Sequence, residues 1–188
     1  SEAGERAVGG DARIDEAQQQ VEERALKLLA LRQPMAVDLR ETLAAIKIAA
    51  ELERIGDLAK NIAKRALVLN REPPIRLTQS LARMGRQAQG QLKQVLDSYS
   101  SRDAGEAEEV WSRDGEIDET YNSLFRELLT YMMEDPRTIG LCTHLLFVAK
   151  NIERCGDHCT NIAELVYHMV NAGHLSTNRP KADITSQT

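Results

Sequence analysis

The feature that most constrains this chain is an internal repeat. Residues 53–63 read Glu-Arg-Ile-Gly-Asp-Leu-Ala-Lys-Asn-Ile-Ala, and residues 153–163 read Glu-Arg-Cys-Gly-Asp-His-Cys-Thr-Asn-Ile-Ala. Seven of the eleven positions are identical at a shift of 100 residues. A second motif, Asp-x-x-Ile-Asp, occurs at residues 11–15 and again at residues 114–118. The chain is therefore predicted to contain two copies of one structural unit.

The repeated unit is predicted to be helical. Ala and Leu each occur 22 times, whereas aromatic residues make up 4% of the chain, a composition that favours helices over sheets. Apolar residues recur at steps of three and four, which is typical of amphipathic helices. They predict helices over about residues 11–31, 34–69 and 77–99, a turn at 100–105, a helix around 117–128 that stops before residue 135, and a last helix over 138–170. Pro34 is expected in the first turn of the second helix.

The predicted fold class is all-α, with two tandem three-helix bundles. The stiff segment at residues 70–74 indicates a boundary, so we assign residues 1–72 to the first repeat and 73–172 to the second. Only the second repeat has a complete helix before its Asp-x-x-Ile-Asp motif, so the first bundle is expected to lack most of its leading helix in this chain. We expect another copy of the chain to cover the apolar stripe left exposed, as in a homodimer. Residues 173–188 are polar and are predicted to be a disordered tail.

Charge and composition exclude several classes of protein. The formal net charge of −5 argues against nucleic-acid binding, which needs a basic surface. No run of 18 apolar residues is present, so we expect no direct membrane insertion. The sequence has no glycine-rich phosphate loop and no Ser/His/Asp pattern, so we expect no enzyme activity. The absence of a phosphate loop also gives little support to a third possibility, a phosphate-binding sensor.

The three cysteines suit a reducing compartment such as the cytoplasm better than a disulfide scaffold. Cys155, His158 and Cys159 lie close enough in sequence to suggest a zinc site. Their counterparts in the first copy are apolar, and two of those lie on the apolar stripe of their helix. We therefore predict that the cysteines are buried and structural.

Acidic residues spaced four apart occur four times. The pairs are Asp11 and Asp15, Glu53 and Asp57, Asp114 and Asp118, and Glu153 and Asp157. On a helix, such a pair lies one turn apart on one face, where like charges oppose each other by about 0.2–0.5 kcal/mol. Helical periodicity predicts that Glu53 and Glu153 face away from the apolar stripes of their own helices, and that Asp11 leans toward a neighbouring helix.

We interpret the four pairs as a shared metal-binding role. Two antiparallel helices with such pairs bring four carboxylates together, and hard or borderline cations prefer oxygen ligands. A mid-helix glycine between the carboxylates, at positions 56 and 156, leaves bare backbone for a close neighbour or ligand. Further candidate ligands or supporting residues are Asn61, Asn161, Arg54 and Arg154. The alternative is a metal-independent interaction module, in which Glu53 and Glu153 pair with arginines across helices.

Two stretches carry a resemblance to a known family. Residues 33–40 read Gln-Pro-Met-Ala-Val-Asp-Leu-Arg, and the duplicated Glu-Arg-x-Gly-Asp segment is followed each time by Asn-Ile-Ala. Over about residues 7–172 the chain resembles the PhoU family. The second copy departs from the pattern, because Arg-Thr-Ile-Gly-Leu follows Pro136.

The resemblance implies a fold, a site and a role. It implies two tandem three-helix bundles whose acidic motifs bind metal clusters, here iron, zinc, manganese or magnesium. It also implies a negative regulator of phosphate uptake and phosphate-starvation signalling, which is an adaptor rather than an enzyme. The implied partners are the ATPase subunit of a phosphate ABC transporter and a membrane sensor histidine kinase. Such a protein would be cytoplasmic and would reach the inner membrane only through these partners.

Overall fold

The computed structural model describes residues 2–70 and 78–175, and within these ranges all regular structure is helical. The elements are α1 (Glu2–Arg32), α2 (Val37–Leu69), α3 (Thr78–Ser101), α4 (Ala104–Ser112), α5 (Gly115–Glu134), the short 3₁₀ helix η1 (Pro136–Thr138) and α6 (Ile139–Asn171). The prediction of an all-α chain is confirmed.

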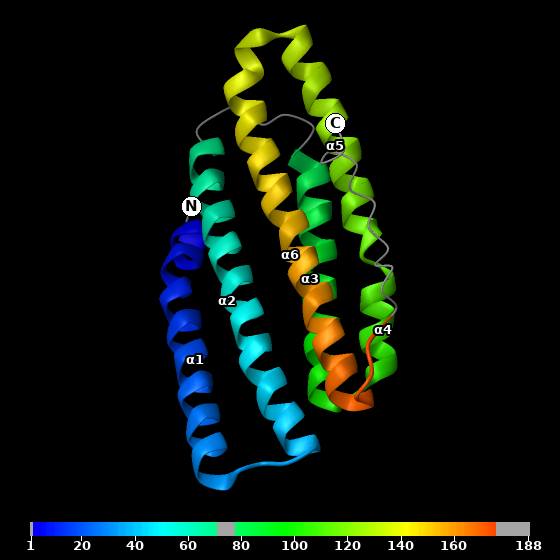
Figure 1. Cartoon of the computed structure of the whole chain (residues 1–188). Coiled ribbons are helices and arrows are strands. Elements are labelled where there is room, and N and C mark those ends of the chain that lie inside the picture. The colour runs from blue at the N-terminus through cyan, green and yellow to red at the C-terminus, as the bar shows by residue number, and fades with distance from the viewer. Residues whose placement is uncertain (1, 71–77, 176–188) are drawn as a thin grey trace.

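Helix α6 lies at the centre of the arrangement. It packs against α2 on one side and against α3, α4 and α5 on the others, whereas α1 packs against α2 (Figure 1). The first copy thus contributes a two-helix hairpin, and the second contributes a bundle built around α6. Of the described chain, no helix has an apolar stretch long enough to cross a membrane.

The two copies meet through their equivalent helices, α2 and α6, which run antiparallel (Figure 1). Near one end of this contact, Glu51 Oε2 lies 2.6 Å from His158 Nδ1. Near the other end, Arg65 Nη1 lies 3.3 Å from His144 Nδ1, and the Arg65 guanidinium stacks 4.1 Å from the centre of the Phe147 ring. Polar and aromatic contacts of α2 with α6 therefore join the copies at two separate places along these helices.

The cysteines are buried, as predicted. Cys142 and Cys159 are almost fully inaccessible, and Cys155 is 8% exposed. Burial raises the pKa of the Cys155 and Cys159 thiols to about 12. They are packed among aliphatic side chains of the core around α6. The thiols of Cys155 and Cys159 therefore stay protonated at neutral pH.

The first two helices differ from their predicted limits. Helix α1 begins at Glu2 rather than near residue 11, so the Gly9-Gly10 pair is accommodated inside it. Pro34 was predicted in the first turn of the second helix, but it lies in the connection before α2. The reason is local, because Gln33 and Ala36 have φ values of 45° and 50°, which a helix does not allow.

Helix α4 was not predicted, because we expected only a turn at residues 100–105 before the next helix. The Asp103 side chain accepts hydrogen bonds from the backbone N–H groups of Gly105 and Glu106, at 2.9 and 3.0 Å. Asp103 is therefore the N-cap of a new helix, entered through Arg102 with a φ of 58°. The Asp-x-x-Glu pattern at residues 103–106 was the available signal.

Two other predictions fall largely outside the described residues. The boundary segment at 70–74 lies there except for residue 70, and the predicted tail lies there from residue 176 onward. The limits assigned to the two repeats therefore stay predictions.

Candidate functional site

Each copy contains a close crossing of two helices at a glycine. A Cβ atom added to Gly56 of α2 would lie 3.0 Å from Ile14 Cδ1 of α1. A Cβ added to Gly156 of α6 would lie 2.9 Å from Ile117 Cδ1 of α5. The glycines thus allow the isoleucine of each Asp-x-x-Ile-Asp motif to sit against the backbone of the partner helix. This packing sets the acidic turns of both helices side by side.

The first acidic seam consists of Asp11 and Asp15 of α1 with Glu53 and Asp57 of α2. Burial raises the pKa of Glu53, and the negative charges of Asp57, Asp15 and Asp11 raise it further. Asp11 is 7% exposed, whereas Asp57 is open to solvent. The structure therefore gathers the four predicted carboxylates of the first copy, and Asp11 leans toward its neighbour as expected.

Lys60 supplies a cation to this seam. Its ammonium donates a hydrogen bond to Asp11 Oδ2 of α1 and lies 3.0 Å from Asp57 Oδ1 of α2. Both contacts raise the pKa of Lys60 above its ordinary value. The Lys60 side chain keeps 27% of its surface exposed. Lys60 therefore links the two helices electrostatically, and the sequence pattern alone did not single it out.

The second acidic seam consists of Asp114 and Asp118, at the start of α5, with Glu153 and Asp157 of α6. Glu153 is 4% exposed, and this burial raises its pKa. The charges of Asp157 and Asp118 also raise it, while Lys150 opposes the shift through a 3.0 Å ion pair. Burial of Glu153 was not expected, since we placed it on a face turned away from the core. It is buried because α6 is covered by helices on several sides.

Asp114 is held by a hydroxyl group. Thr160 Oγ1 donates a hydrogen bond to Asp114 Oδ1 at 2.7 Å, and both side chains are buried. Thr160 occupies the repeat position of Lys60. The two seams therefore share carboxylates and glycine, but differ in the side chain that reaches the first aspartate of each motif.

The other predicted site residues lie apart from these carboxylate contacts. The Asn161 side chain donates a hydrogen bond to Glu51 of α2 at 3.0 Å, so it belongs to the contact between the copies. Asn61, Arg54 and Arg154 are exposed on their helices. The cations that form ion pairs with the seam carboxylates are lysines rather than the arginines considered from sequence.

In the side-chain positions that the structure describes, no three His, Cys, Asp or Glu side chains converge tightly enough to ligate one ion. Two seam oxygens nevertheless have no hydrogen-bond partner although they are buried: Asp11 Oδ1 and Glu153 Oε2. Buried carboxylate oxygens are normally satisfied, so each of them is a place where a ligand could bind.

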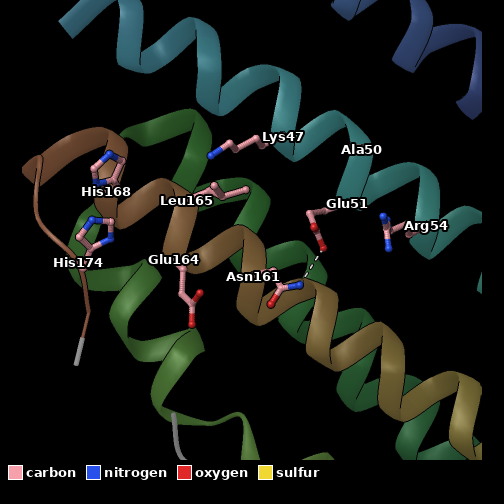
Figure 2. A pocket seen from close by; sticks show the side chains of 9 residues that line it. All are labelled: Lys47, Ala50, Glu51, Arg54, Asn161, Glu164, Leu165, His168 and His174. Atoms are coloured by element: carbon pink, nitrogen blue, oxygen red, sulfur yellow. Dashed lines mark hydrogen bonds between the residues drawn. The ribbon is translucent and has the colours of Figure 1, made fainter. Parts of the chain in front are cut away.

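A polar cavity of about 370 Å³ lies between α2 and the end of α6 (Figure 2). Lys47 and Arg54 line it together with Glu51 and Glu164, and the rings of His168 and His174 stack with centroids 4.7 Å apart. The wall carries charges of both signs, and Glu51 is already bound to Asn161 (Figure 2). The cavity is therefore part of the contact between the two copies. Comparison of the repeats does not reveal this contact, because the residues at positions 51 and 158 differ from their counterparts at positions 151 and 58.

These observations define the class: a duplicated all-α protein in which each copy brings acidic turns of two helices together. The model of the family described as PhoU domain matches residues 1–66 and 81–166. The chain belongs to the PhoU family.

Named relatives agree with this assignment. The chain is 59% identical over 181 residues to the phosphate-specific transport system accessory protein PhoU homolog of Caulobacter vibrioides, covering 96% of this chain and 79% of that protein. It is 52% identical over 183 residues to the homolog of the same description from Rhizobium meliloti, covering 97% and 77%.

Solved structures agree as well. The crystal structure of PhoU from Pseudomonas aeruginosa matches with a TM-score of 0.87 at 36% identity, covering 90% of this chain and 82% of that one. The phosphate transport system regulatory protein PhoU from Streptococcus pneumoniae matches with a TM-score of 0.83 at 27% identity, covering 93% and 82%.

Proposed function

We propose that this chain is an accessory regulator of phosphate transport that acts by binding rather than by catalysis. The observation that carries the proposal is the duplicated acidic seam, in a chain whose relatives are described as accessory proteins of the phosphate-specific transport system. Its role would be negative, lowering phosphate uptake and phosphate-starvation signalling when phosphate is plentiful.

The seams fit divalent or trivalent metal ions in the chemistry of their donor groups. All eight candidate side chains offer carboxylate oxygen, which suits magnesium and manganese and is also used by iron and zinc. Each seam contains one buried carboxylate with an unpartnered oxygen, Asp11 in the first and Glu153 in the second. Burial raises the pKa of Glu53 and of Glu153, so a positive charge bound beside either carboxylate would favour its charged form.

Bound metal would supply positive charge between carboxylates that otherwise repel each other. The residues of this chain would then hold the helices in register: Asp11 and Asp15 from α1 with Glu53 and Asp57 from α2, and the equivalent set from α5 and α6. Gly56 and Gly156 set the distance between the paired helices, because a larger side chain there would meet the facing isoleucine. Metal loading would thus fix the surface that partners recognise.

An exposed apolar tip supports a docking role. It is the turn between α1 and α2, where Leu31 is 79% exposed and Met35 is 81% exposed, with Val37 beside them at 50%. Clustered apolar side chains in solvent mark interaction surfaces. We assign this tip to the ATPase subunit of the phosphate ABC transporter. A sensor histidine kinase would bind elsewhere on the chain, which would act as a homodimer in the cytoplasm, beside the membrane that holds its partners.

A second candidate function is a metal-independent interaction module. It is favoured by Lys60, which already forms ion pairs with Asp11 and Asp57 and so stabilises the first seam without a metal. In that case the carboxylates would serve as contact residues only.

One experiment separates the two functions. The affinity of the purified chain for the transporter ATPase subunit is measured by biolayer interferometry with MnCl₂ and with EDTA, for the wild type and for D57N/D157N. The matched control is E23Q/E127Q, which removes the same charge from exposed positions of α1 and α5. We expect the wild type and the control to bind the ATPase subunit more weakly in EDTA than in MnCl₂. D57N/D157N should bind it weakly in both conditions. Binding that is the same in all conditions would favour the metal-independent module, and no binding at all would refute the adaptor role.

A further inference from the structure

Each acidic seam carries its own lysine, and the two lysines come from different repeat positions. Lys60 of α2 serves the first seam, and its counterpart in the second copy is Thr160. Lys150 of α6 serves the second seam, and its counterpart in the first copy is Ala50. The lysines therefore occupy different positions of the repeat, yet the ammonium group of each contacts a carboxylate of its own seam.

Both lysines contact the two helices of their seam. The Lys60 ammonium binds Asp57 on its own helix and Asp11 on α1. The Lys150 ammonium binds Glu153 on its own helix, at 3.0 Å, and lies 5.1 Å from the centre of the Tyr121 ring on α5. A cation over an aromatic face is attracted to it, so Lys150 also spans its seam.

One buried carboxylate in each seam has a hydrogen-bond partner at only one of its two oxygens. Asp11 accepts from Lys60 through Oδ2, while its Oδ1 is buried without a partner. Glu153 accepts from Lys150 through Oε1, while its Oε2 is buried without a partner. Each lysine ammonium contacts one oxygen of this carboxylate, whereas a divalent ion can bind both oxygens of a carboxylate or several carboxylates at once.

We propose that the ammonium groups of Lys60 and Lys150 take the place of the metal ions when the seams hold no metal, and that a metal ion binds each seam by displacing its lysine. The proposal rests on the metal-binding role proposed above and adds a regulatory feature to it. Without metal, the ammonium groups offset the repulsion between the carboxylates, so the helices stay paired. With metal, the protonated ammonium groups move into solvent, and loading succeeds only when the ion outcompetes them.

Displacement of the lysines by metal predicts two effects that are not expected if the lysines have a purely structural role. Removing the ammonium should strengthen metal binding while weakening the metal-free fold, because the same group does both. Displacement should also expose the amine: Lys60 and Lys150 should be acylated faster by an amine-reactive reagent when Mn²⁺ is present.

The test compares the wild type with K60M, K150M and K60M/K150M, using K64M as the control, since Lys64 is exposed on α2 one turn beyond Lys60. Mn²⁺ affinity is measured by isothermal titration calorimetry, and melting temperatures are measured in EDTA and in MnCl₂. We expect K60M and K150M each to raise Mn²⁺ affinity about tenfold, as removal of a competing cation implies, and to melt lower in EDTA. K64M should match the wild type, and mass spectrometry should show Mn²⁺-enhanced acylation of Lys60 and Lys150.

The outcomes distinguish this inference from the proposed function. If the wild type binds Mn²⁺ but the lysine variants bind it no more tightly, the lysines do not compete with the metal. The displacement proposal is then wrong, and the proposed metal binding stands. If neither the wild type nor any variant binds Mn²⁺, the metal-binding function fails and the inference fails with it. Acylation that is unchanged by Mn²⁺ in a protein that binds it would also overturn the displacement.

Discussion

Ile117 of α5 lies directly against the backbone of Gly156 of α6, so closely that a Cβ atom on the glycine would be 2.9 Å from Ile117 Cδ1. The equivalent pair in the first copy, Ile14 and Gly56, would be 3.0 Å apart. The surroundings differ, however, because Ile117 is 1% exposed and Ile14 is 38% exposed. Similar contacts should therefore respond differently to the same substitution.

We predict that G156A destabilises the protein, while G56A is close to neutral. Alanine gains about 1 kcal/mol of helix propensity over glycine, but overpacking a buried site costs about 1–3 kcal/mol. At Gly156 the cost wins, since Ile117 is enclosed; at Gly56 the exposed Ile14 can move aside. The check is the urea midpoint of each variant, with G90A as a control because no atom lies within 4 Å of its added Cβ. Greater stability of G156A than of G90A would contradict this packing account.

The second prediction concerns pH and Glu153. Burial raises the pKa of this carboxyl above its ordinary value, so between the two values the folded chain binds more protons than the unfolded chain. The contribution of Glu153 to stability must therefore fall as pH rises through that interval. In EDTA, the free energy of unfolding of the wild type relative to E153Q should decrease from about pH 4 to pH 7. A difference that stays flat or increases with pH would show that Glu153 is not held in an unfavourable charged state.

Glu51 gives a third prediction, about the contact between the copies. Its carboxylate accepts from the Asn161 amide and lies 2.6 Å from His158 Nδ1, and E51A would leave both groups without this partner. We expect a loss of about 1 kcal/mol in unfolding free energy, because two contacts of the partly buried Glu51 carboxylate are removed. E23A is the control, since the Glu23–Lys27 pair is exposed on α1. Equal effects of E51A and E23A would mean that Glu51 does not hold the copies together.

The exposed apolar tip gives the fourth prediction. L31S/M35S should leave the urea midpoint nearly unchanged, since both side chains already lie in solvent, and should weaken binding to the transporter ATPase subunit at least tenfold. M133S is the control, because Met133 is 84% exposed at the end of α5, which lies at the opposite end of the molecule (Figure 1). If L31S/M35S binds the ATPase subunit as tightly as the wild type does, this tip is not the docking surface.

Features that depend on spacing along one helix could be predicted from the sequence. The repeat, the helical class, the burial of the cysteines and a close neighbour at each duplicated glycine all follow from periodicity or from residue type. The lean of Asp11 toward α2 follows from its place at the edge of an apolar stripe. These inferences need no knowledge of how distant helices are arranged.

Features that depend on which helices meet could not be read in this way. Glu153 lies opposite the apolar stripe of its own helix, but it is buried because other helices cover α6 on several sides. Lys60 is an ordinary helical lysine until α1 brings Asp11 to it. Helix α4 is different, because the capping pattern at Asp103 was available in the sequence and was overlooked.

The measurement that most directly tests the central claim is elemental analysis by inductively coupled plasma mass spectrometry. The protein should be purified without chelator and without a metal-affinity column, as the wild type, as D57N/D157N and as the control E23Q/E127Q. We predict stoichiometric iron, zinc, manganese or magnesium in the wild type and the control, lost in D57N/D157N although that variant stays folded. Metal retained by D57N/D157N, or absent from a folded wild type, would contradict the assignment of the acidic seams as metal sites.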